Sequence, residues 1–96
     1  MARITVLRPD LDLDDRPVAP LAPRRPLPDT PLLTLIENGK PKARQLLELL
    51  AERLRPRLGD LAVETFSKPS AAKPISADEA RLMAARSHLV ITGLGD

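Results

Sequence analysis

The sequence contains no cysteine, tryptophan or tyrosine, and Phe66 is its only aromatic residue. Without cysteine, the 96-residue chain can form no disulfide, no thiolate metal site and no thiol nucleophile. A single aromatic side chain argues against base stacking on single-stranded nucleic acid. His88 is the only histidine, which excludes a metal site built from several histidines. We therefore expect no metal, no other cofactor and no nucleic-acid partner.

A charge bias and long apolar runs are also missing. The formal net charge is +2 and residues of both signs are interspersed, so no field that attracts a polyanion is expected. No apolar run approaches the roughly 20 residues of a membrane span, and the N-terminus lacks the apolar core of a secretory signal. These features predict a cytoplasmic protein without a membrane partner, and the alanine, arginine, proline and leucine bias indicates a GC-rich bacterial gene.

Proline is abundant, and its distribution divides the chain. Seven of the eleven prolines lie in residues 1–31, where they exclude a helix and any central strand. We predict that residues 1–31 form an extended arm, in which only residues 4–7 have the composition of a short edge strand. A linker role is favoured over a proline-rich ligand motif. Residues 32–96 are predicted to form an α/β domain.

Three short β-favouring runs follow the arm. Residues 32–36 and 88–92 are apolar almost throughout, which is typical of strands that are covered on both faces of a parallel sheet. Residues 61–66 differ because Glu64 lies in the middle of the run. A charge at that position indicates an edge strand.

Helical periodicity is clearest in residues 42–55. Apolar side chains recur there at the i, i+3, i+4 and i+7 spacing of one buried stripe. Pro56 disfavours helical geometry at Arg55, so the helix is predicted to end there. The predicted stripe consists of Ala43, Leu46, Leu47, Leu50 and Leu54.

A capping box marks the start of a second helix. The Ser76 hydroxyl can accept the amide of Glu79, and the Glu79 carboxylate can accept the amide of Ser76. This helix is predicted to run to about residue 86. Its inward face is predicted to consist of Ala80, Met83 and Ala84.

The order strand, helix, strand, helix, strand predicts parallel strands with right-handed crossovers. The strand compositions favour the spatial order 2-1-3 with one helix on each face, as in half of a flavodoxin-like or Rossmann-like sheet. In that arrangement the third strand needs a further neighbour. Ordering about 65 residues costs on the order of 100 kcal/mol of entropy, which so small a core balances with difficulty. We therefore expect a domain truncated after its third strand, unless that strand pairs with a second chain.

In a parallel sheet, the loops that follow the strands lie at one edge. Here these loops span residues 37–41, 67–74 and 93–96, and they carry lysines, glycines and small polar side chains suited to an anion or carboxylate. Loop lysines that are merely solvated are an equally common explanation. The predicted substrate-binding residues are Asn38, Gly39, Lys40, Lys68, Ser70, Gly93, Gly95 and Asp96.

Two other features indicate function less strongly. Gly93 and Gly95 match only the first half of a dinucleotide-binding fingerprint. His88 begins a strand at the opposite end of the sheet from the loops, so we expect no acid–base role for it.

Residues 36–41, 68–71 and 90–96, in this order, resemble segments of the UGSC-like family. The family is named for a selenocysteine-Gly-Ser-Cys motif, in which cysteine replaces selenocysteine in many members. In the family, such segments precede a strand that ends in Gly-Asp, and the motif follows. The resemblance covers about residues 32–96, with Glu37 and Leu94 departing from the pattern. It implies the N-terminal half of such a domain, with the catalytic residues expected immediately after Asp96.

The resemblance also implies a cause for the missing motif, namely a UGA selenocysteine codon after Asp96 that was read as a stop. The parent protein would then be a selenol- or thiol-dependent enzyme, redox or nucleophilic, that acts on a small anionic substrate. The 96-residue chain itself would be inactive. The alternative is a small non-catalytic interaction module that forms a homo-oligomer through its last strand and arm.

Overall fold

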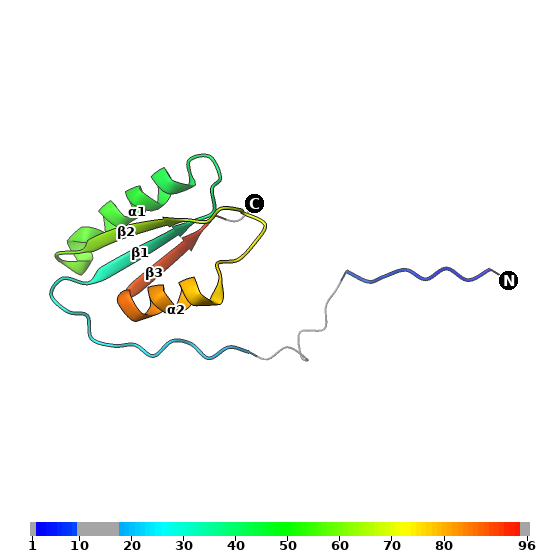
Figure 1. Ribbon diagram of the computed structural model, residues 1–96, viewed down its shortest axis with the longest axis horizontal. Coiled ribbons are helices and arrows are strands. Elements are labelled where there is room, and N and C mark those ends of the chain that lie inside the picture. Colours follow the sequence, from blue (N-terminus) through cyan, green and yellow to red (C-terminus); the bar gives the residue numbers. More distant parts are fainter. Residues whose placement is uncertain (1, 10–17, 95–96) are drawn as a thin grey trace.

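The computed structural model describes residues 2–9 and 18–94, and its elements follow the predicted order (Figure 1). They are strand β1 (Leu32–Glu37), helix α1 (Ala43–Leu58), strand β2 (Ala62–Ser67), helix α2 (Ala77–Arg86) and strand β3 (Leu89–Gly93). The three strands are parallel and lie in the order β2-β1-β3. The two helices cover opposite faces of the sheet (Figure 1). The predicted α/β fold and its 2-1-3 strand order are confirmed.

The central strand β1 is buried because it has a neighbour on each side and a helix over each face. Leu33 and Leu35 point toward α1 and are completely buried, and Thr34 and Ile36 on the other face are also buried. The core beneath α1 consists of Leu33, Leu35, Leu47, Ala51 and Leu61, with Leu54, Leu58, Val63, Leu89 and Ile91 packed against it.

Helix α1 contacts the sheet through a narrower stripe than the sequence predicts. Ala43, Leu47 and Ala51 are buried, whereas Leu46 and Leu50 are 51% and 40% exposed. The buried stripe is thus one residue wide at each turn and has Leu47 at its centre. The predicted burial of Leu46 and Leu50 is therefore wrong.

Helix α1 also extends beyond its predicted end, to Leu58. Pro56 lies in the last turn, where its missing amide removes only one intrahelical hydrogen bond. The helix ends instead at Gly59, which has a φ of 79° and donates its amide to the carbonyl of Arg55 at 3.0 Å.

Helix α2 begins with the predicted capping box. The Ser76 hydroxyl accepts the Glu79 amide at 3.1 Å, and Glu79 Oε2 accepts the Ser76 amide at 3.2 Å. The predicted inward face is only partly correct, since Met83 is half-buried but Ala80 and Ala84 are exposed. Ser87, just beyond the helix, bonds Thr34 of β1, and Arg86 pairs with Glu64 of β2. Polar contacts therefore tie α2 to the sheet, and none of its residues is fully buried.

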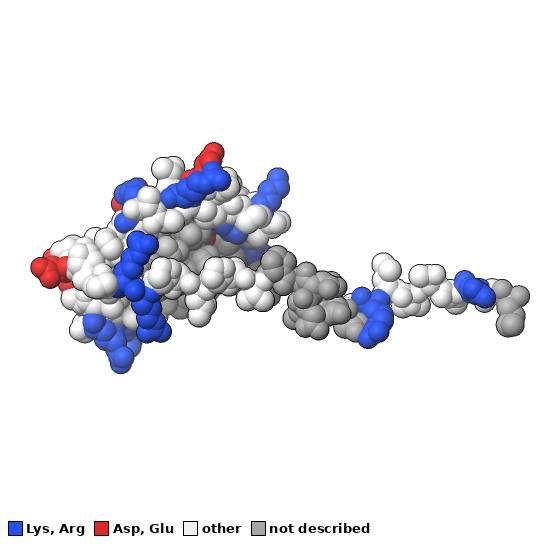
Figure 2. Space-filling view, turned by 90° about the horizontal axis from the view of Figure 1, so that it is seen from below, with Lys and Arg blue, Asp and Glu red and all other residues white. Residues whose placement is uncertain are grey.

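The described parts of residues 1–31 contain no helix or strand. Residues 4–7 are extended and exposed, with Ile4 and Leu7 each 88% exposed, so the edge strand predicted there is not formed. Pro31 is fully buried where the chain enters β1. Basic side chains are spread over the face seen in Figure 2, and some of them lie beside acidic side chains. Within residues 2–9 and 18–94, no helix is long and apolar enough to cross a membrane.

Candidate functional site

The exits of β1 and its two neighbours are joined by hydrogen bonds at the carboxyl end of the sheet. The Asn38 side-chain amide donates to the carbonyl of Leu94, which follows β3. On the other side, the Lys68 amide donates to the carbonyl of Glu37 at 2.9 Å. The first and last loops thus lie side by side, as the parallel topology predicts, and the loop after β2 lies against them.

Asn38 and Gly39 form a tight turn between β1 and α1. Asn38 is buried, and its Oδ1 accepts the amide of Lys40 at 3.3 Å. This bond from a side chain to the backbone two residues on is an Asx turn. Gly39 has a φ of 79°, which L-residues rarely adopt, and a Cβ there would lie 3.5 Å from the Lys68 carbonyl. Conformation rather than lack of space therefore favours glycine at this position.

Glu37 is a buried carboxylate within the site, and the sequence prediction did not include it. Its Oε2 accepts the Gly39 amide at 2.7 Å. A hydrogen bond from the Ser67 side chain, the Gly39 amide and the charge of Arg44 hold the pKa of Glu37 below its ordinary value, against the opposing effect of burial. The signal in the sequence was an acidic residue directly after the apolar strand predicted at residues 32–36 and immediately before Asn-Gly.

The predicted binding side chains after β2 bond to their own loop. Lys68 donates from Nζ to the carbonyl of Lys73 at 2.9 Å, and the Ser70 hydroxyl accepts the Ala72 amide at 3.1 Å. Both residues lie at the same edge of the sheet as Asn38 and half-buried Lys40. A bound anion would compete with the carbonyl of Lys73 for the Lys68 ammonium group.

The last predicted residues lie at the exit of β3. Gly93 ends the strand, and a Cβ there would meet Leu47 Cδ2 at an ordinary contact distance of 3.6 Å. Gly95 and Asp96 lie outside the described residues. Among the residues that the structure describes, no group of three His, Asp or Glu side chains could hold a metal ion.

A family model described as the UGSC family matches residues 5–96. The chain belongs to the UGSC family. The match extends beyond residues 32–96, which carry the resemblance, into the proline-rich arm. Comparisons with curated proteins and with solved structures found no match.

The segments that resemble the UGSC family meet in space at this edge of the sheet. Residues 36–41 include the end of β1 and the Asn38 turn, and residues 68–71 begin the loop after β2. The described part of residues 90–96 includes most of β3 and Leu94, to which Asn38 is bonded. Segments far apart in sequence therefore contribute to one site.

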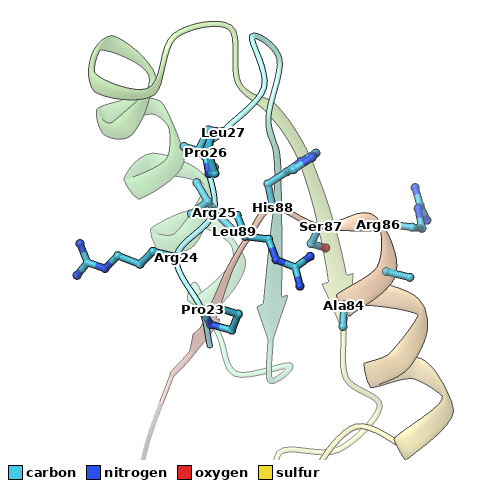
Figure 3. Close-up of a pocket in the computed structure, with 11 residues that line it drawn as sticks. Pro23, Arg24, Arg25, Pro26, Leu27, Ala84, Arg86, Ser87, His88 and Leu89 are labelled. Atoms are coloured by element: carbon cyan, nitrogen blue, oxygen red, sulfur yellow. The ribbon is translucent and has the colours of Figure 1, made fainter. Parts of the chain in front are cut away.

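His88 lies at the other end of the sheet, as predicted. Its Nδ1 accepts the Leu32 amide at 2.9 Å and its own amide donates to the Leu32 carbonyl at 2.9 Å, so it joins the starts of β1 and β3. Beside it, arm residues 23–27 and residues 84–89, from the end of α2 to the start of β3, line a cavity of about 590 Å³ (Figure 3). This cavity is separate from the loops that carry the predicted site.

Proposed function

We propose that the chain is the N-terminal scaffold of a UGSC-family selenoprotein or thiol protein, and that its reactive residue follows Asp96 in the parent protein. The observation that supports this most directly is the hydrogen bond from Asn38 to the Leu94 carbonyl. It attaches the exit of β3 to the central strand. Only Gly95 and Asp96 lie between Leu94 and the position at which the family motif is expected. Asn38 acts in this proposal as a positioning residue.

The buried polar groups around Asn38 give this positioning a rigid base. The ionised Glu37 carboxylate accepts the Gly39 amide, and Ser67 donates to it from the neighbouring strand. Charge-assisted hydrogen bonds to a carboxylate are stronger than neutral ones. The turn that carries Asn38 is therefore fixed to both β1 and β2.

A selenol or thiol in a loop between β3 and a following helix would have a lowered pKa and would be a good nucleophile. Lys40 and Lys68, at the same edge, would bind the anionic group of a small substrate. Redox chemistry and covalent addition to an electrophile both fit such a residue. A reducing bacterial cytoplasm would keep it in its reactive form. The 96-residue chain, which has no cysteine, would be inactive.

Reading the genomic DNA downstream of the Asp96 codon tests this proposal. We expect an in-frame UGA followed by codons for Gly-Ser-Cys and by a further reading frame. The extended protein, expressed with cysteine at the UGA position, should react with iodoacetamide faster than free cysteine at neutral pH. A UAA or UAG codon, or the absence of Gly-Ser-Cys after a UGA, would overturn the proposal.

A second candidate function is a non-catalytic module that oligomerises through β3. It is favoured by the position of β3 at an end of the sheet, where its outer side pairs with no strand among the described residues.

A further inference from the structure

The cavity beside His88 lies between the arm and the domain, and its volume of about 590 Å³ is typical of a small-molecule site (Figure 3). One wall consists of arm residues 23–27 and the other of residues 84–89. The arm lies against the domain here, since Leu27 is 42% exposed whereas Leu21, earlier in the arm, is 96% exposed. The family match includes residues 23–27. Both walls therefore belong to the UGSC-family part of the chain.

The arm contributes a cation that has no partner. Arg25 extends across the cavity toward Ser87, whereas Arg24 points away from it (Figure 3). Among the residues that the structure describes, Arg25 forms no hydrogen bond or ion pair. Arg86, also at the cavity, pairs with Glu64, and no described side chain that lines the cavity is acidic. The Arg25 guanidinium can therefore bind a carboxylate, whose two oxygens match its paired N–H donors.

The opposite wall has the opposite polarity. The last turn of α2 lines it, and the carbonyls at the end of an α-helix have no intrahelical partner and carry a partial negative charge. The Ser87 amide bonds one of them, the carbonyl of Met83, at 2.8 Å. The carbonyls of Ala84, Ala85 and Arg86 follow it in the chain. This wall therefore favours an ammonium group and opposes a simple anion.

Apolar side chains line much of the remaining cavity. They are Pro23, Pro26 and Leu27 from the arm, and Ala84 and Leu89 from the domain. Because Arg25 extends toward Ser87, the cationic group and the end of α2 lie on the same side of the cavity (Figure 3). A ligand suited to this arrangement has a carboxylate and an ammonium group close together, and an apolar group beside them.

We propose that this cavity binds an apolar α-amino acid. Its carboxylate bonds Arg25, its ammonium group bonds the carbonyls at the end of α2, and its side chain contacts the apolar residues of both walls. The site lies at the opposite end of the sheet from the loops of the proposed reactive site. It is a second, separate site and does not rest on the proposed function.

An NMR titration of the isotope-labelled 96-residue chain tests the ligand class. The probes are leucine, isocaproate, which lacks the ammonium group, and isoamylamine, which lacks the carboxylate. Leucine should shift the amide signals of Arg25, Leu27 and residues 84–89. Each analogue should bind about tenfold more weakly or worse, because it loses a charge-assisted hydrogen bond.

Two arginine variants test the position of the site. Arg25→Gln should weaken leucine binding about tenfold. Arg24→Gln is the matched control, because it removes the same charge at the neighbouring position but from a side chain that points away from the cavity, and it should leave leucine binding unchanged. Both positions lie outside the helices and strands, and far-UV circular dichroism would show that each variant is folded.

Isocaproate binding as tight as leucine binding, equal effects of the two variants, or no leucine-dependent shifts at these residues would overturn the inference. None of these results changes the downstream codon that tests the selenoprotein proposal.

Discussion

Replacing Asn38 with alanine should loosen the exit of β3 from the central strand. The substitution removes the bond from Nδ2 to the Leu94 carbonyl and the bond from the Lys40 amide to Oδ1. Both bonds are partly buried, and each such bond contributes about 0.5–1.5 kcal/mol net. The free energy of unfolding should therefore fall by about 1–3 kcal/mol. Asn38→Asp keeps the oxygen that accepts from Lys40 but loses the donor to Leu94, so it isolates the bond between the loops.

Urea denaturation followed by far-UV circular dichroism measures the loss, because the chain has no tryptophan or tyrosine for fluorescence. Hydrogen exchange should show where the loss occurs. Amides of β3 should exchange faster in both variants, by roughly tenfold for each 1.4 kcal/mol. Ser70→Ala removes one bond in an exposed loop and serves as the control. If Asn38→Ala is within about 0.5 kcal/mol of wild type and β3 exchange is unchanged, Asn38 does not position this loop.

Three further predictions concern the core, the buried carboxylate and the cap of α2. Leu35→Ala should lower the free energy of unfolding by about 2–5 kcal/mol in urea titrations, because Leu35 is completely buried. Leu49→Ala, at an exposed position, should change it by less than about 0.5 kcal/mol. The folded-state pKa of Glu37 is lowered, so its stabilisation is present above about pH 4.5 and is lost as pH falls through the folded pKa. Glu37→Gln should therefore flatten the acid limb of stability against pH, and an unchanged acid limb would contradict this origin. Ser76→Ala should cost about 1 kcal/mol by thermal denaturation, whereas an effect near zero would show that the capping box contributes little.

The strand order was predictable because burial and charge differ among the strands. The apolar β1 is central, and Glu64 places β2 at an edge, where it pairs with Arg86. The flank of α1 that is buried was not predictable from periodicity. Ala51 and Leu50 both fit a helical stripe, and it is Ala51 that the fold buries.

The meeting of the three loops at one edge of the sheet was predictable, but their contacts were predictable only in part. Parallel strands bring their following loops to one edge, so Asn38 and Lys68 were expected to lie near each other. The partners of these residues depend on loop conformation, which directs Lys68 to the Lys73 carbonyl. Glu37 was missed because an acidic residue beside a turn is usually solvated. Its burial results from the Gly39 amide and the Ser67 side chain, which the fold brings to it.

Mass spectrometry of the protein from its native host tests the central claim most directly. The account predicts a peptide that continues through Gly95 and Asp96 into Gly-Ser-Cys, and the residue between Asp96 and the following Gly should give the isotope pattern of one selenium atom. A C-terminal peptide that ends at Asp96, with no longer form in the same cells, would contradict it.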